Sequence, residues 1–200
     1  MTKTYITLVV AFCGLGCDSN TSQSVKDQAA AEERTPLFFE ESALRGVSFR
    51  VNSDLGEGAL MPEIMLGGGA AFDFDDDGWL DLYFIQGSNG ANELYRNRGD
   101  GTFEQLNEIG DAADTGYGFG TATADVDADG DVDLFVSNLG KDVLLRNDGD
   151  GHFTDVTDLS GLGDIGWGTS ATFFDADLDG DPDLFVTRYI DWSLQRERFC

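Results

Sequence analysis

The sequence is poor in several residue types on which protein chemistry often depends. Its 200 residues include one histidine, three cysteines and three prolines, and only 12 lysine and arginine residues face 38 aspartate and glutamate residues. The resulting net charge of −26 repels nucleic-acid phosphates and anionic lipid headgroups, so we expect no nucleic-acid partner and no electrostatic membrane docking. Because 41% of the residues are hydrophobic and 12% are aromatic, the chain is too apolar for an acidic disordered tail and is expected to fold.

The few cysteines lie at the two ends of the chain. Cys13 and Cys17 belong to an N-terminal apolar segment, and Cys200 is the last residue. Cys200 therefore has no internal partner in the mature chain, and we expect no internal disulfide. An unpaired thiol in an exported protein indicates a partner beyond residue 200, so the chain is expected to be the N-terminal part of a longer protein.

The N-terminus has the order of an export signal. Lys3 is followed by an apolar run over residues 5–12, which is shorter than the roughly 20 residues of a membrane-spanning helix but suits a secretory signal. Residues 1–17 are predicted to be a signal peptide, and the small residues before Cys17 resemble a bacterial lipobox, which implies lipidation of Cys17. The membrane contact would then be the lipid anchor, with residues 18–36 as a polar tether. Secretion without lipid and a buried N-terminal strand are the alternatives.

Self-comparison reveals a repeat of about 50 residues. The pattern Asp-x-Asp-x-Asp-Gly-x-x-Asp occurs three times, at intervals of 52 and 50 residues. We number its positions 1 to 9 and name the copies acid loop 1 (73–81), acid loop 2 (125–133) and acid loop 3 (175–183). A second motif, Asn-x-Gly-Asp-Gly, occurs at 97–101 and 147–151 and is typical of a hairpin turn.

Each repeat is predicted to form four short antiparallel strands. Residues 169–174 alternate small and aromatic side chains into acid loop 3, and an apolar run follows that loop. Four strands per 50 residues indicate an all-β fold, a β-propeller of four-stranded blades, present here as an incomplete set. The expected ranges are a lead-in strand region at 37–66 and repeats at 67–200, with blades at about 67–116, 117–166 and, incomplete, 167–200. A β-sandwich with acidic hairpins is the alternative.

The acid loops have the composition of calcium sites. Ca²⁺ takes six to eight oxygen ligands, which carboxylates at positions 1, 3, 5 and 9 and a carbonyl at position 7 can provide, while the glycine at position 6 permits the sharp turn. We expect about one Ca²⁺ per repeat. The predicted ligands are Asp73, Asp75, Asp77, Trp79 (through its carbonyl) and Asp81; Asp125, Asp127, Asp129, Asp131 and Asp133; and Asp175, Asp177, Asp179, Asp181 and Asp183.

A different loop type or a different metal fits the acid loops less well. An EF-hand has a glutamate at position 12 and flanking helices, whereas Phe84, Val136 and Val186 stand there, so position 9 is expected to take the bidentate role. Zinc is disfavoured because the loops contain no histidine or cysteine, and Mg²⁺ because it prefers fewer carboxylates. Solvated acidic turns without a ligand are the remaining alternative.

These motifs resemble the FG-GAP or VCBS repeats of integrin α-subunit propellers and of exported bacterial proteins. More narrowly, residues 62–70 before acid loop 1 and residues 188–192 after acid loop 3 are similar to the ASPIC and UnbV proteins, relatives of cartilage acidic protein. The resemblance implies a Ca²⁺-binding propeller with the acid-loop aspartates as ligands.

We expect a non-enzymatic, exported repeat module on the cell surface, or a secreted one, that binds a protein or glycan partner in adhesion or as a scaffold. The alternative is a fragment of a propeller enzyme whose catalytic residues lie beyond residue 200. No catalytic residue is predicted in this chain. The single histidine, His152, stands in a hairpin where the first repeat has Thr102, which favours a surface turn residue over a general base.

Overall fold

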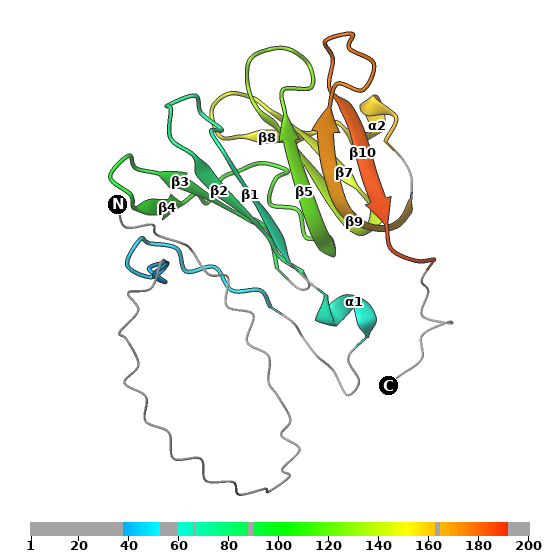
Figure 1. Ribbon diagram of the computed structural model, residues 1–200. Helices are drawn as coiled ribbons and strands as arrows, with labels where there is room; N and C mark the ends of the chain where they lie inside the picture. The colour runs from blue at the N-terminus through cyan, green and yellow to red at the C-terminus, as the bar shows by residue number, and fades with distance from the viewer. Residues whose placement is uncertain (1–37, 53–59, 66, 88–89, 163–164, 192–200) are drawn as a thin grey trace, which may run out of the picture.

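A computed structural model describes residues 38–52, 60–65, 67–87, 90–162 and 165–191 (Figure 1). The predicted signal peptide with Cys17, the tether at 18–36 and Cys200 lie outside the described residues. None of the helices in these ranges is long and apolar enough to cross a membrane.

The first repeat forms a four-stranded antiparallel sheet. Its strands follow one another in space as they do in sequence, so neighbours are joined by short connections. They are β1 (Gly68–Phe72), β2 (Asp81–Ile85), β3 (Glu93–Asn97) and β4 (Phe103–Gln105). Helix α1 (Met61–Ile64) precedes this sheet.

The second repeat has the same four strands, and the third contributes two more. The strands are β5 (Gly118–Ala124), β6 (Asp133–Lys141), β7 (Val143–Asn147), β8 (Phe153–Asp155), β9 (Ile165–Phe174) and β10 (Asp183–Arg188), with helix α2 (Thr157–Ser160) after β8. The end of β6 pairs with the start of β9, and this pairing joins the second and third repeats into one sheet. The predicted all-β fold is confirmed, and the described sheets form an open array.

Each acid loop connects the first two strands of its repeat. The strand pairs close directly beside the loops, with Phe72 opposite Asp81, Ala124 opposite Asp133 and Phe174 opposite Asp183. Figure 1 shows all three loops at the same end of the sheets. Position 9 of every loop is therefore also the first residue of a strand.

The first strands of successive repeats pack side by side, and glycine makes this approach possible. A Cβ at Gly68 would lie 2.7 Å from the carbonyl oxygen of Phe119 in β5, and a Cβ at Gly120 would lie 2.3 Å from that of Thr169 in β9. Both distances are shorter than any real Cβ contact. The same glycine position thus gives the close approach between neighbouring repeats twice.

The main hydrophobic core lies between the first two sheets. It includes Phe72, Phe74, Tyr83, Ile85, Leu94, Leu134, Val136, Leu145 and Phe153. A smaller cluster holds the N-terminal segment against the first sheet, where the ring of Phe49 stacks on that of Phe84 at 4.9 Å. In the expected lead-in region, residues 38–52 and 60–65 contain a turn, one bridge residue and helix α1 rather than strands.

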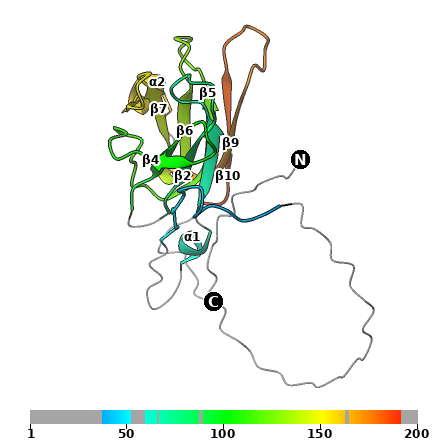
Figure 2. The ribbon, with the colours of Figure 1, turned by 90° about the vertical axis from the view of Figure 1, so that its left-hand side faces the viewer.

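The third repeat stands at the edge of the array, as Figure 2 shows for β9 and β10. Phe185 in β10 is 57% exposed, whereas its counterpart Phe135 in β6 is fully buried. Leu134 and Val136 face the core toward the first repeat, so alternation along β6 turns Phe135 toward the third repeat, which packs there; no described strand follows β10 to cover Phe185 in the same way.

Candidate metal centres in the acid loops

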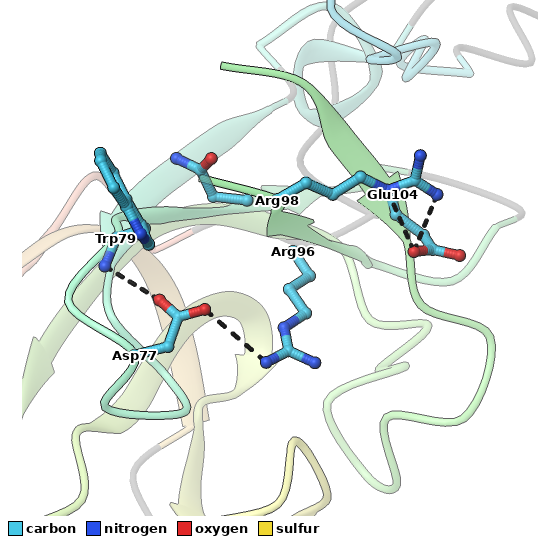
Figure 3. Close-up of a pocket in the computed structure, with 6 residues that line it drawn as sticks. Asp77, Trp79, Arg96, Arg98 and Glu104 are labelled. Atoms are coloured by element: carbon cyan, nitrogen blue, oxygen red, sulfur yellow. Dashed lines mark hydrogen bonds and ion pairs between the residues drawn. The ribbon is translucent and has the colours of Figure 1, made fainter. Parts of the chain in front are cut away.

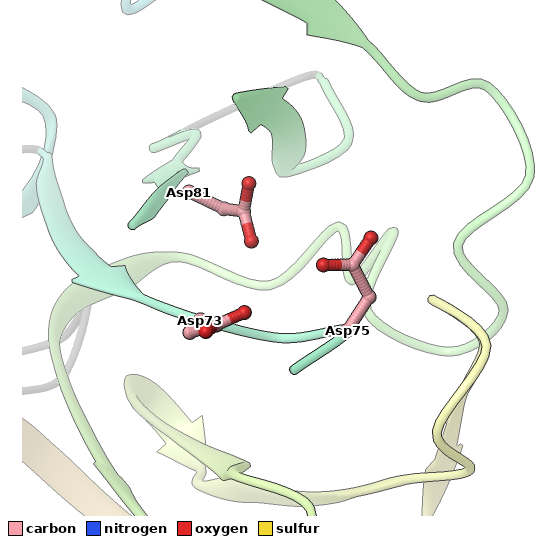
Figure 4. Close-up of side chains that lie close together, drawn as sticks. All are labelled: Asp73, Asp75 and Asp81. Atoms are coloured by element: carbon pink, nitrogen blue, oxygen red, sulfur yellow. The ribbon is translucent and has the colours of Figure 1, made fainter. Parts of the chain in front are cut away.

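Three carboxylates converge in each acid loop. They come from positions 1, 3 and 9, and in every loop one oxygen of each lies within 4.8 Å of the other two. Figure 4 shows Asp73, Asp75 and Asp81 facing one another in acid loop 1. The corresponding sets are Asp125, Asp127 and Asp133, and Asp175, Asp177 and Asp183. The repeated arrangement follows from the repeated sequence.

Two backbone features curl each loop. Position 6 is glycine at positive φ, and position 4 also has positive φ although it is not glycine: Asp76 at 53°, Ala128 at 59° and Leu178 at 63°. The curl brings the N–H of position 6 to the carboxylate of position 1. Gly78 donates to Asp73 Oδ2 at 2.8 Å, and the same bond measures 3.0 Å in acid loop 2 and 3.1 Å in acid loop 3.

Position 9 links the acid loop to the hairpin motif. The N–H of Phe74 donates to Asp81 Oδ2 at 3.1 Å, and the N–H of Asn97 donates to Asp81 Oδ1 at 2.7 Å. Asp133 accepts the matching bonds from Val126 and Asn147, both at 2.8 Å. Both oxygens of these buried aspartates already accept a hydrogen bond from a main-chain N–H. Only their remaining lone pairs are therefore available to bind a cation.

Burial changes the proton affinity of position 9 in acid loops 1 and 2. Desolvation raises the pKa of Asp81 to about 6, against the lowering effect of its two main-chain hydrogen bonds. The pKa of Asp133 is raised for the same reason. A nearby cation would favour the ionised form of both groups and oppose this shift.

The carboxylates fit a hard cation. Oδ1 of Asp75 and Oδ1 of Asp125 are buried and accept no hydrogen bond. A buried carboxylate oxygen without a partner is costly, and a bound cation would satisfy it. Since each converging set offers only oxygen atoms, the chemistry suits Ca²⁺ or Mg²⁺ rather than zinc.

The other predicted ligands lie outside the converging sets. Position 5 (Asp77, Asp129 and Asp179) accepts the N–H of position 7 through Oδ1, at 2.9, 2.9 and 3.0 Å. Position 7 is Trp79, Asp131 and Asp181, for which the sequence predicted a carbonyl ligand. The structure thus groups positions 1, 3 and 9 and places positions 5 and 7 in a turn beside them.

An arginine that sequence reasoning missed lies against acid loop 1. Arg96 Nη2 is 2.5 Å from Asp75 Oδ2 and 3.6 Å from Asp77 Oδ2. Its counterpart Arg146 instead pairs with Asp148 at 3.0 Å, in the hairpin of its own repeat. The sequence shows an arginine before the hairpin motif in both repeats, but it does not show which carboxylate each arginine pairs with.

The single histidine takes no part in these sites. His152 is exposed in the turn between β7 and β8, with Nδ1 3.5 Å from Asp148 Oδ2. Its location agrees with a hairpin position.

Comparison with known families identifies the repeat. The model of the FG-GAP-like repeat matches residues 73–136 and 125–186, which together span more than half of the chain. The chain belongs to the FG-GAP-like repeat family. The match supports the FG-GAP repeat but not the narrower resemblance to the ASPIC and UnbV proteins. No curated protein matches the chain.

Proposed function

We propose that the chain is a non-enzymatic, β-propeller-like binding module of an exported protein, in which each acid loop holds one Ca²⁺. The observation that carries the proposal is the convergence of the same three carboxylates in all three loops. Adhesion or scaffolding through a protein or glycan partner is the role that best suits a repeat module of this composition.

Ca²⁺ is the cation of choice because of the number of carboxylates. The residues that would hold it are at positions 1, 3 and 9, and the carboxylates of position 5 lie in the same turn. Mg²⁺ demands a near-octahedral set and keeps much of its water, whereas Ca²⁺ accepts six to eight oxygens in flexible geometry. When bound, the ion supplies positive charge that offsets the crowded carboxylates.

Repulsion between the crowded carboxylates favours the binding of a cation in each acid loop. Two carboxylates about 5 Å apart repel by roughly 1 kcal/mol in water and about 3 kcal/mol at an effective dielectric constant of about 20. Each loop has three such pairs among positions 1, 3 and 9. Because each loop joins the first two strands of its repeat, ion binding would stabilise the strand pairs on both sides.

Thermal unfolding of the full chain tests the calcium proposal. We expect a higher melting temperature in Ca²⁺ than in EGTA, and elemental analysis should find close to one calcium per acid loop. The variant with Asp73, Asp125 and Asp175 all replaced by Asn should lose both effects. An unchanged melting temperature, or a metal-free protein after dialysis against Ca²⁺, would refute the proposal.

Export rests on residues 1–17, so it needs its own test. We expect the chain expressed in a bacterium to incorporate radiolabelled palmitate, and Cys17→Ser to abolish the label. A wild-type chain that stays in the cytoplasm at full length would contradict export, and an exported, unlabelled chain would indicate secretion without lipid.

A further inference from the structure

A pocket of about 310 Å³ opens beside acid loop 1, between this loop and the β3–β4 hairpin. Figure 3 shows side chains from both segments around it. Its lining consists of Asp77, Trp79, Arg96, Asn97, Arg98 and Glu104. The volume is near the lower end of the range for small-molecule sites, about 300–1,000 Å³, and so suits one small ring rather than a long chain.

Trp79 gives the pocket an aromatic wall. Its side chain is at position 7 of acid loop 1 and is 52% exposed. The indole packs against the hairpin turn, because a Cβ added to Gly99 would lie 3.0 Å from its Nε1 atom. One edge of the ring is therefore held in place, and much of its surface stays open to solvent.

The polar groups of the pocket are planar and balanced in charge. Arg98 Nη2 lies 2.9 Å from Glu104 Oε2, and Arg96 Nη2 lies 3.6 Å from Asp77 Oδ2. The lining thus has two arginines and two carboxylates on a chain of net charge −26, and Arg96 also pairs with Asp75 of acid loop 1, at 2.5 Å. This lining attracts neither a strong anion nor a strong cation, but its paired donors and acceptors suit neighbouring hydroxyl groups.

The second repeat has the same strands without this chemistry. Asp131 stands at the position of Trp79, and Asp148 stands at the position of Arg98. Asp148 pairs with Arg146 at 3.0 Å and accepts a hydrogen bond from the Thr154 hydroxyl at 2.9 Å. The carboxylate there serves its own hairpin, and the aromatic wall is replaced by an acidic side chain. The pocket is accordingly a feature of the first repeat.

We propose that this pocket binds one neutral pyranose ring of a glycan. The apolar C–H face of the sugar would lie on the indole of Trp79, and Asn97, Arg98 and Glu104 would bond its hydroxyl groups. The inference rests on the proposed role as a binding module and narrows its partner to a neutral sugar. An aromatic surface beside a few directed polar groups is the usual design of a small-ligand site.

Saturation-transfer NMR of the full chain in Ca²⁺ tests this proposal. The probes are the methyl glycosides of glucose, galactose, mannose and N-acetylglucosamine. We expect saturable transfer to at least one glycoside. Trp79→Asp, which installs the residue of the other two loops, should weaken its binding about tenfold, the equivalent of about 1.4 kcal/mol. Glu104→Gln should also weaken it, whereas Arg146→Gln in the second repeat should have no effect.

Two outcomes would overturn the inference: no transfer to any of the four glycosides, or transfer to Trp79→Asp equal to wild type. The melting temperature in Ca²⁺ and in EGTA is measured on the same samples. If calcium stabilises the chain but no glycoside binds, the glycan proposal is refuted and the calcium proposal stands. If a glycoside binds but calcium has no effect, the calcium proposal is refuted and the glycan proposal stands. A calcium shift retained by Trp79→Asp shows that this variant is folded.

Discussion

The side-chain amide of Asn147 donates a hydrogen bond to the carbonyl oxygen of Phe74, 73 residues earlier in the chain, at 2.7 Å. Phe74 is position 2 of acid loop 1, and Asn147 begins the hairpin motif of the second repeat. The N–H of the same asparagine donates to Asp133 in acid loop 2. The hairpin motif and two acid loops are thereby joined into one network across the boundary between repeats.

Replacing Asn147 by alanine should therefore destabilise the chain strongly. The side chain is fully buried and makes three hydrogen bonds, two to carbonyl oxygens and one from the N–H of Gly149. Leaving these buried groups without partners should cost about 2–4 kcal/mol in the free energy of unfolding, measured by urea denaturation.

Asn97→Ala is the matched control. Among the described residues, the Asn97 side chain bonds only within its own repeat, to the Leu80 carbonyl and from the Gly99 N–H, and it is partly exposed. Its loss should cost about 1 kcal/mol. Equal costs at the two positions would show that the bond to Phe74 contributes nothing.

The part of the site that spacing alone could predict is the set of positions 1, 3 and 9. A recurring pattern of aspartates around a glycine implies a curled loop, and the curl brings these side chains together. Spacing alone could not predict the orientation of positions 5 and 7. The N–H of Trp79 at position 7 donates a hydrogen bond to Asp77 at position 5, and this local bond orients both residues.

The contacts between repeats could not be predicted from the sequence either. Gly120 can be read in the sequence, but glycine is required there because of the carbonyl oxygen of Thr169 in the next repeat, which the sequence does not show. Arg96 illustrates the same limit, since its partner Asp75 lies across a sheet rather than along the chain. Four strands per repeat, in contrast, followed from alternation and turn residues.

Gly120→Ala tests the close approach of the first strands. The new methyl group would lie 2.3 Å from the Thr169 carbonyl oxygen, so one strand must shift, at a cost of about 2–3 kcal/mol in unfolding free energy. Gly166→Ala is the control, because its Cβ would meet only the Arg188 side chain, at 3.5 Å. It should change the unfolding free energy by less than about 0.5 kcal/mol. Similar losses for both variants would show that the contact with Thr169 is not what requires glycine.

Arg96→Gln should increase the metal affinity of acid loop 1. The guanidinium pairs with Asp75, a member of the converging set, and so competes with a cation for that carboxylate. Removing one positive charge at this distance should tighten binding by on the order of tenfold. Tb³⁺ luminescence that is present in the wild type and lost in Trp79→Phe reports this site, because Trp79 lies within acid loop 1 whereas the other two tryptophans, Trp167 and Trp192, lie outside the acid loops.

Arg146→Gln supplies the comparison for Arg96→Gln, because Arg146 pairs with Asp148 in its own hairpin. The Tb³⁺ titration observed through Trp79 should match wild type in this variant. An Arg96→Gln chain that binds Tb³⁺ no more tightly than wild type would show that the ion pair with Asp75 does not compete with metal.

The stability of the metal-free chain should fall as the pH rises from about 4 to about 6. Burial raises the pKa of Asp81 from 3.8 to about 6, so in this window the folded chain binds more protons than the unfolded chain. Asp133 acts in the same direction. Hydrogen bonds from Thr102 lower the pKa of Asp100, but the stability from that group is lost only below about pH 4, outside the window.

Calcium should reverse this pH dependence, because metal and protons compete for the same carboxylates. With excess Ca²⁺, the free energy of unfolding should therefore rise between pH 4 and about pH 6, as Asp81 becomes available to the ion. Urea denaturation of the dialysed chain and of the calcium-loaded chain across this range measures both slopes. In Asp81→Asn the contribution of this site to both slopes should disappear. Equal slopes for the metal-free wild type and metal-free Asp81→Asn would show that burial does not keep Asp81 protonated in this window.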